Sequence, residues 1–490
     1  MSVFKRLFSS GPCNSFTRWF CYACNDQSTE GGTRGGKRMA ARRSVSVIAA
    51  VGVLVGVLGA IGASAAPPAA ANASAVTQWN LIAANTLAGL PPPAGGAPPA
   101  SQINMGMVEG AVYDAVNAIT PKHHRPYLLK RRFGNTASDE AAVATAAYLV
   151  LKNVVETVPS TIASFTPAMR ATLLASLETQ YNASKNAIPD SPFKNMGIAA
   201  GTAAAQAMIE ARQGDGRFGL SQFVPNANPG HWDPVAPNGT TAPDPTPWVG
   251  GVEPFLMQSS SQFRSPGPNA LTSPAYAADV NEVKALGGDG VVTPSARTAT
   301  QTYVAKWWQS NPMASWNDVA RQLITKNHLD VSDAARLLAM ENLAAADAAI
   351  NTWNNKYHFS FWRPFQAIRR AADDGNSATS PDPTWTPLIS APYPEHTSGH
   401  LGLDSSHTTV LRMFFGDAPA GGYQITSAFV NPGGPATRTF TGFSQAVDEI
   451  VEARIWAGLH FRTADVQGVQ LGTNVANYAA ANYFEPVGNH

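Results

Sequence analysis

The stretch VSDAARLLAMENLAAADAAINTWNNKYHFSFWRP, residues 331–364, decides the fold. Its apolar residues recur at helical spacing and predict one long helix over residues 331–356. They include Leu337, Leu338, Leu343, Ala346 and Ile350. Pro364 cannot lie inside a helix without losing a hydrogen bond and clashing with the preceding turn, so this helix must end before Arg363. A new helix can start with Pro364 in its first position. We therefore expect Lys356 at a helix end and Arg363 at a helix start, both facing one cavity.

Apolar periodicity on either side of this stretch predicts further helices. They are expected around residues 107–119, 138–158, 167–183, 193–212, 298–309 and 316–325. Alternation typical of strands is scarce, and no internal repeat of fixed period is present. The predicted fold is all-α, built from packed helical bundles.

Residues 214–300 differ from the rest because Pro and Gly recur throughout them. We predict a long irregular connection between N-terminal helices (66–213) and a C-terminal helical part (301–490). A structureless segment of this length is unusual unless it has a function. Its aromatic residues, among them Trp232, Trp248, Phe255 and Phe263, indicate packing on the body of the protein. The segment could be a linker or a lid, and the sequence does not separate the two.

The composition indicates a chain with a sizeable core and an acidic body. Of 490 residues, 44% are hydrophobic and 14% charged. Eight of the 34 basic residues but only two of the 33 acidic ones precede Ala66, which leaves 26 basic and 31 acidic residues after it. This balance gives no reason to expect a nucleic-acid partner. Cys13, Cys21 and Cys24 also precede Ala66, so the body has no thiolate chemistry, and we interpret Cys21-x-x-Cys24 as incidental.

Residues 1–65 are predicted to be an N-terminal extension with a signal peptide. Arg42-Arg43 precedes an apolar run from Val45 to about Ile61, and residues 63–65 form an A-x-A cleavage pattern. Met39 is an alternative start, and an uncleaved membrane anchor is the alternative role of the apolar run. Cleavage near Ala66 would give a secreted or cell-envelope protein without a membrane span.

The segment 394–400, PEHTSGH, is a second cluster of polar residues. Apolar residues at helical spacing follow it, and Thr397 or Ser398 is a natural N-cap. The backbone N–H groups of Ser398, Gly399 and His400 would then be unpaired at a helix N-terminus, where an anion is favoured. Gly399 would let the anion approach the backbone closely.

A third cluster is RIWAGLHFR, residues 454–462. On an unbroken helix, a six-residue step puts Arg454 and His460 about 120° apart. The two side chains can meet one ligand only near a helix end, and Gly458 allows a break. The three clusters together supply two Arg, one Lys, a hydroxyl, helix N-terminal amides and two His, which can neutralise a tetrahedral oxyanion. Taken singly, Lys356 and Arg363 could be surface charges, Ser398-Gly399 an ordinary cap and His460 a core histidine.

The motifs Lys356-x6-Arg363-Pro364, Ser398-Gly399-His400 and Arg454-x5-His460 resemble the signature of vanadium-dependent haloperoxidases and type 2 phosphatidic acid phosphatases. Trp353 and the sequence FSFWRP (359–364) are closer to the haloperoxidase branch, as is EGAVYDAVN (109–117) to its bacterial members. This chain has Thr397 where the family usually has Pro, and it lacks an acidic residue around 308–310. Tyr393 and His396 occupy variable positions that are thought to influence halide preference.

The resemblance implies a role for each motif residue. His460 would ligate vanadium, while Lys356, Arg363, Arg454, Ser398 and Gly399 would hold the oxygens of vanadate. His400 would act as acid/base and Lys356 would polarise bound hydrogen peroxide, so that a halide is oxidised and an organic acceptor halogenated. The alternative is a phosphatase, with phosphate in the same site, His460 as nucleophile and His400 as acid. A third hypothesis is a phosphate-binding protein without turnover.

Three other histidines are interpreted as structural or left open. We expect His358 and His407 to be structural, although His407 lies seven residues after His400 and could reach the cavity. His396 could be either. The sequence leaves open the halide, the acceptor, the oligomeric state and the choice between haloperoxidase and phosphatase.

Overall fold

The computed structural model describes residues 73–120, 124–220, 223–429 and 434–487. The predicted extension, signal peptide and cysteines lie outside these residues. Within them, no helix combines the length and apolarity that crossing a membrane requires.

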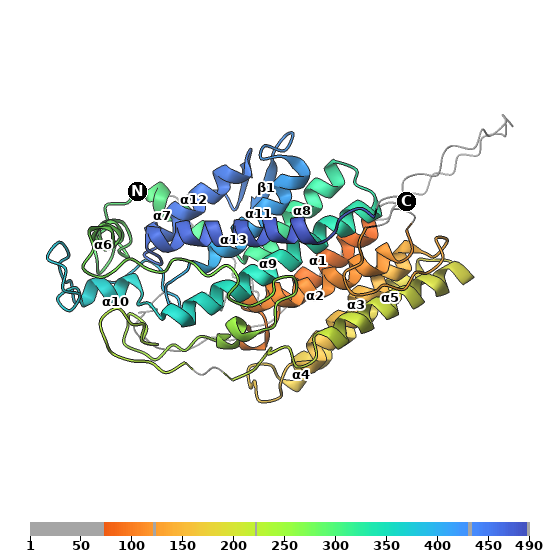
Figure 1. The fold of residues 1–490 in the computed structure, drawn as a ribbon, viewed down its shortest axis with the longest axis horizontal. Helices are drawn as coiled ribbons and strands as arrows, with labels where there is room; N and C mark the ends of the chain where they lie inside the picture. The colour runs from red at the N-terminus through yellow and green to blue at the C-terminus, as the bar shows by residue number, and fades with distance from the viewer. Residues whose placement is uncertain (1–72, 121–123, 221–222, 430–433, 488–490) are drawn as a thin grey trace, which may run out of the picture.

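Helices dominate the structure, which confirms the all-α prediction (Figure 1). They are α1 (Ser74–Ala88), α2 (Pro98–Asn117), α3 (Asp139–Thr157), α4 (Pro167–Asn186), α5 (Pro192–Ala211), α6 (Pro274–Leu286), α7 (Ala299–Trp307), α8 (Pro312–Lys326), α9 (Val331–Phe359), α10 (Pro364–Arg369), α11 (Gly399–Phe415), α12 (Phe443–Trp456) and α13 (Arg462–Asn482). Two short 3-10 helices, η3 (Pro92–Ala94) and η4 (Pro247–Gly251), complete the helical elements of the described residues. Polar side chains cap several starts: Ser138 accepts from the N–H of Ala141 at α3, as its sequence predicted.

The long helix α9 is the centre of the molecule. Figure 1 shows it between the N-terminal helices, drawn orange to yellow, and the blue C-terminal helices. It packs against α2 on one side and α11 and α13 on the other, while α3 packs against α4 and α5. Most α9 side chains are buried, including the apolar face predicted from the sequence. This packing brings residues that are far apart in sequence to the C-terminal end of α9.

The described part of the chain contains one small sheet, which the sequence did not predict. Strands β1 (Tyr423–Thr426) and β2 (Thr437–Phe440) pair antiparallel, with Tyr423 opposite Phe440. Tyr423 also stacks on Phe443 at the start of α12, with ring centroids 4.8 Å apart. The hairpin is thus anchored by aromatic packing, which short strands need for stability.

The Pro- and Gly-rich segment 214–300 lies packed against α9. Its Trp232, Trp248 and Phe255 are buried, which confirms the expectation from its aromatic residues. The buried carboxylate of Asp347 in α9 accepts hydrogen bonds from the backbone N–H groups of residues 255–257 at 2.6–2.8 Å. The segment also contains the whole of α6, so the expectation of an irregular connection throughout was wrong. Ser273 caps this helix and Pro274 opens it.

Candidate active site

The break between α9 and α10 positions Lys356 and Arg363, the residues of the first motif. Helix α9 ends at Phe359, and Ser360 adopts a left-handed conformation with φ of 47°. Arg363 has the extended conformation that a following proline favours, and Pro364 is the first residue of α10. Lys356 lies in the last turn of α9. The predicted helix end and helix start are therefore both confirmed.

Gly458 creates the break that brings the third motif together. Helix α12 ends at Trp456, and Gly458 has φ of +74°. A Cβ atom at this position would lie 2.6 Å from the carbonyl oxygen of Gly287, so only glycine fits here. The chain then turns so that His460 lies beside Arg363, whose Nη1 is 3.3 Å from His460 Nε2.

Glu395 fixes the orientation and tautomer of His460. Nδ1 of His460 lies 3.1 Å from Glu395 Oε1, which also accepts the backbone N–H of Phe461 at 2.9 Å. A guanidinium can only donate, so the contact from Arg363 makes His460 Nε2 the acceptor and puts the ring proton on Nδ1. In this structure the Nε2 lone pair therefore accepts from Arg363, and a ligand atom bound to Nε2 would have to take the place of this hydrogen bond.

The two motif arginines are held by backbone carbonyls and keep unpaired N–H groups. Arg363 donates from Nε to Tyr393 at 2.6 Å and from Nη1 to Leu459 at 2.9 Å, while its buried Nη2 has no partner. Arg454 donates from Nη1 to the carbonyl of Trp308 at 3.1 Å, and its buried Nε has no partner. Buried donors without partners are costly, so these atoms indicate a place for an acceptor that is not part of the chain.

Lys356 is at the site, but its ammonium group contacts the protein. It donates to the carbonyl oxygens of Pro394, Glu395 and Thr397 at 3.0, 3.1 and 2.6 Å. An ammonium has three N–H donors, and these contacts use all of them. In this structure Lys356 therefore holds the 394–397 loop in place, and contact with an oxyanion would require it to exchange one carbonyl.

The start of α11 differs in two respects from the expected anion site. Ser398 is the N-cap residue, but its side chain does not cap the helix, and its backbone N–H donates to Ala464 at 3.2 Å. Only the amides of Gly399 and His400 remain from the predicted three, because first-turn N–H groups have no acceptor within the helix. A Cβ atom on Gly399 would lie 3.2 Å from the Trp353 indole, so the glycine also makes room for this ring.

His400 has one nitrogen bonded to the backbone and one without a partner. A backbone hydrogen bond joins its ring to Ser310. The other nitrogen, Nε2, is buried and unpaired. The loop before α8 thus positions His400 through its main chain. Ser310 belongs to residues 308–310, where the family resemblance predicts an acidic side chain that this chain lacks.

Burial and positive charge dominate the electrostatics of the site. Burial, followed by the charge of Arg363, holds the pKa of Lys356 and of His460 well below their ordinary values. The pKa of His400 is also well below its usual range, first through burial and then through Arg454. Burial raises the pKa of Glu395 to about 8. An anion in this position would offset the repulsion between these cations.

The roles of Glu395 and Asp465 were not predicted from the sequence, and Tyr393 was named without its contact to Arg363. Glu395 was quoted only as part of the second cluster, although it orients His460. Asp465 of α13 lies buried beside Ser398, and burial raises the pKa of its carboxyl well above its usual range. The Tyr393 ring covers Arg363, with the guanidinium carbon 4.8 Å from the ring centroid. A carboxylate three residues before a helix N-cap and an acid in the first turn of α13 are signals that could have found the first two.

The other candidate histidines lie outside the centre. His407 is buried between Glu341 and Gln102, at 3.0 and 2.8 Å, and so does not reach the cavity. His396 Nε2 lies 3.0 Å from both Ser265 Oγ and Gln467 Oε1. His358 is exposed at the end of α9.

Comparisons with known proteins agree with this geometry. The model of the VCPO second helical-bundle domain matches residues 336–488, which contain all three motifs. Vanadium chloroperoxidase of Curvularia inaequalis is 25% identical over 217 residues, covering 37% of this chain and 35% of that protein. The chain thus matches about a third of the length of this curated relative.

Two solved structures share the fold over most of the chain. One is described as the first bacterial vanadium-dependent iodoperoxidase, with a TM-score of 0.66, 21% identity and coverage of 86% of this chain and 100% of the other. The second is a holo-type bacterial vanadium-dependent chloroperoxidase, with a TM-score of 0.62, 18% identity and coverage of 81% and 93%. The predicted resemblance is thus confirmed: the C-terminal part of this chain is similar to vanadium haloperoxidases in its family domain and its curated relative, and the described residues share the fold of the two bacterial enzymes.

Proposed function

We propose that this protein is a vanadate-dependent haloperoxidase that oxidises a halide with hydrogen peroxide. The observation that carries the proposal is the set of atoms around His460. Its Nε2 lone pair lies beside Arg363, and the buried Nη2 of Arg363, Nε of Arg454 and Nε2 of His400 have no protein partner. The unpaired arginine atoms offer donors for the oxygens of a tetrahedral oxyanion, and His460 Nε2 offers a lone pair for its central atom if the contact with Arg363 is exchanged.

The residues present fit vanadate and divide its binding among them. His460 Nε2 would be the ligand, while Arg363, Arg454, Ser398 and the Gly399 amide would hold oxygens. Bound vanadate supplies a Lewis-acid centre that activates hydrogen peroxide for attack by a halide. His400 is neutral because burial lowers the pKa of its ring, so its Nε2 can take a proton from incoming peroxide and later return it. Lys356 would add a fourth cation if it exchanged one carbonyl of the 394–397 loop.

A phosphatase at the same site is the second candidate. The observation that favours it is the hydrogen bond from His460 Nδ1 to Glu395, which presents the Nε2 lone pair as a nucleophile. The same Nε2 would attack phosphorus and His400 would protonate the leaving oxygen. The two functions therefore differ in the ligand rather than in the residues.

A parallel assay separates the two functions. Purified protein is assayed with and without added vanadate for peroxide-dependent halogenation of a neutral 1,3-diketone and for hydrolysis of a phosphate monoester. We expect halogenation that depends on vanadate, and phosphate-ester hydrolysis that vanadate inhibits or that is absent. Hydrolysis without any halogenation, under each of chloride, bromide and iodide, would replace the first proposal by the second.

We also propose export, on the basis of the basic, apolar and A-x-A succession in residues 42–65. The mature protein should begin near Ala66. Intact-mass measurement of the exported form tests this, and retention of residues 45–62 would contradict it.

A further inference from the structure

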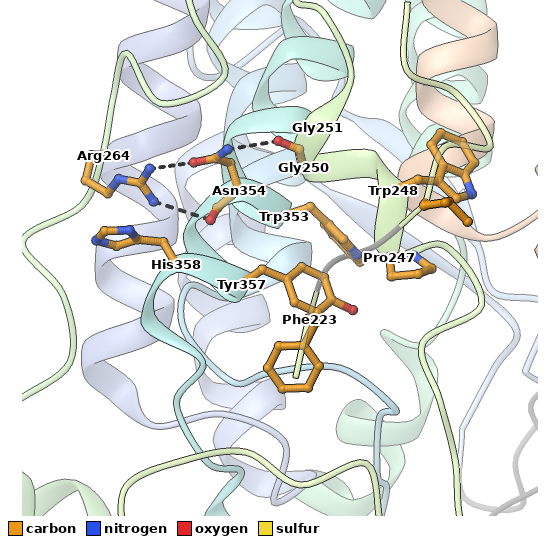
Figure 2. A pocket seen from close by; sticks show the side chains of 11 residues that line it. Phe223, Pro247, Trp248, Gly250, Gly251, Arg264, Trp353, Asn354, Tyr357 and His358 are labelled. Carbon is orange, nitrogen blue, oxygen red and sulfur yellow. Dashed lines mark hydrogen bonds between the residues drawn. The ribbon is translucent and has the colours of Figure 1, made fainter. Parts of the chain in front are cut away.

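A cavity of about 400 Å³ lies beside the motif site, between α9 and the segment that contains η4. Its size falls in the range of pockets that bind small organic molecules. Figure 2 shows the side chains that line it. The ones on which the inference depends are Phe223, Trp248, Arg264, Trp353, Tyr357 and His358.

Two aromatic side chains turn their polar atoms away from this cavity. The Tyr357 hydroxyl donates to Asp244 Oδ2 at 2.7 Å, and Trp353 Nε1 donates to the same oxygen at 3.0 Å. Asp244 is buried, and its carboxylate fixes the orientation of both rings through these two hydrogen bonds. Phe223 packs edge-on against Tyr357, with centroids 5.4 Å apart. Aromatic rings therefore form part of the cavity wall, beside polar groups such as Asn354, and this part suits a flat aromatic molecule.

One end of the cavity carries positive charge. Arg264 donates to the Asn354 carbonyl at 3.3 Å and to Asn354 Oδ1 at 2.5 Å (Figure 2). It donates a third hydrogen bond to Asn355 Oδ1 at 3.1 Å. A guanidinium has five N–H donors, so two remain. Across the described part of the chain, Arg264 forms no ion pair with a carboxylate. His358, which is exposed beside it, adds a second nitrogen donor. This end of the cavity thus suits an anionic group.

Trp353 is a wall shared by the cavity and the motif site. Its indole lies 3.2 Å from the position of a Cβ on Gly399, and its ring centroid is 5.6 Å from Lys356 Nζ. A molecule against Trp353 would therefore be one ring away from the groups assigned to vanadate.

We propose that this cavity binds a small aromatic anion, a single ring with a carboxylate, as the organic acceptor of the enzyme. The ring lies between Trp248, Tyr357 and Phe223, and the carboxylate faces Arg264 and His358. The role as acceptor rests on the proposed function. In that reaction a ring carbon bonds to the halogen of hypohalous acid, the halogen–oxygen bond breaks, and the ring proton leaves with hydroxide as water.

Equilibrium binding tests the cavity without turnover. Calorimetry on the full chain compares 4-hydroxybenzoate with 4-hydroxybenzyl alcohol, which lacks the charge, and with cyclohexanecarboxylate, which lacks the aromatic ring. We expect 4-hydroxybenzoate to bind at least about 10-fold more tightly than either, since a charge-assisted hydrogen bond contributes about that much. Equal affinity for all three, or no binding, would overturn the proposal.

Two variants assign the binding to this cavity. Arg264→Met should weaken 4-hydroxybenzoate about 10- to 100-fold while leaving the neutral alcohol within about twofold. Arg131→Met is the matched control, because Arg131 is exposed and does not line the cavity. Gly251→Leu should weaken both aromatic probes, since Gly251 lines the cavity, a Cβ there meets nothing within 4 Å, and the larger side chain takes up space at the cavity wall. Unchanged binding in Gly251→Leu, with the fold intact by circular dichroism, would contradict the site.

A halogenation assay separates failure of the cavity from failure of the proposed function. Binding that depends on Arg264, in a protein that halogenates no acceptor, would keep the cavity as a binding site and reject its role as acceptor site together with the proposed function. Halogenation of the neutral diketone without any binding of 4-hydroxybenzoate would keep the proposed function and reject the cavity.

Discussion

Two histidines on α11 differ in how their ring nitrogens are hydrogen-bonded. His407 has both ring nitrogens bonded to protein, at 3.0 Å from Glu341 and 2.8 Å from Gln102. His400, two turns earlier, has one nitrogen bonded to the backbone of Ser310 and leaves Nε2 unpaired. Burial lowers the pKa of both rings. A lowered pKa therefore does not separate the two histidines, whereas the unpaired nitrogen of His400 does, together with its partial exposure.

The surroundings of the two histidines differ in the same way. Around His407, buried amide and carboxyl side chains form hydrogen bonds with one another. For example, Asn342 Nδ2 donates to Asn317 Oδ1 at 2.9 Å, and Asn80 Nδ2 donates to Glu109 Oε1 at 3.0 Å. The unpaired atoms in that network are carboxyl oxygens of Glu109 and Glu341, whose pKa values are raised by burial. Around His400 the unpaired atoms include cationic N–H groups. These contacts are those of a structural network around His407, and they support the proposed anion site around His400.

Removing His400 should have the largest effect on activity. His400→Ala deletes the proposed proton carrier and leaves Arg363, Arg454 and His460 in place. We expect kcat to fall about 10²–10⁴-fold while vanadate affinity changes little. Steady-state halogenation and calorimetric titration with vanadate measure the two quantities. Full activity in this variant would show that the three motifs do not form the active site.

His460→Ala should instead remove the ligand. His460 supplies the one proposed bond from protein to vanadium, so we expect vanadate affinity to fall about 100-fold or more and activity to fall with it. Loss of binding in His400→Ala but not in His460→Ala would reverse the two assigned roles. Arg363 and Arg454 remain in both variants, so a difference in vanadate affinity between the two variants reports on the histidines alone.

The sequence predicted the residues of the site better than their partners. The helix breaks at Pro364 and Gly458 follow from local backbone chemistry, and both are confirmed. The expectation that His407 is structural is also confirmed. The partners of three residues could not be predicted: the carbonyls around Lys356, the contact of His400 with Ser310, and Glu341 and Gln102 beside His407. They depend on which segments the tertiary fold brings together, and spacing along the chain carries no such information. Helix α6 was missed because prolines are frequent on both sides of it. Its start nevertheless carries two ordinary signals, the N-cap Ser273 and Pro274 in the first helical position.

Removing His407 should affect stability and spare activity. His407→Ala leaves Glu341 and Gln102 without their partner and creates a small cavity in a buried network. We expect the free energy of unfolding to fall by about 2–4 kcal/mol, with kcat per folded molecule within about twofold of the wild type. Urea unfolding and active-site titration measure these. A large loss of kcat in a folded His407→Ala protein would remove the contrast between the two histidines.

The smallest effect concerns the pH dependence of stability in the structural network. Burial raises the pKa of Glu109 from 4.5 to about 7, against the opposing effects of Asn80 and Arg321. Because the folded-state pKa is the higher one, the folded protein binds more protons between pH 4.5 and 7, and the contribution of Glu109 is lost as the pH rises through that window.

Glu109→Gln cannot titrate, so the stability of the wild type relative to this variant should fall by about 1–3 kcal/mol from pH 5 to pH 8, with little change above about pH 8. The pKa of Glu341 is also raised, first by burial and then by the charge of Glu109. Urea unfolding of both proteins at pH 5, 6, 7 and 8 measures the difference. A difference that stayed constant or rose with pH would mean that Glu109 is ionised in the folded protein, and the network around His407 would then carry a buried charge as the anion site does.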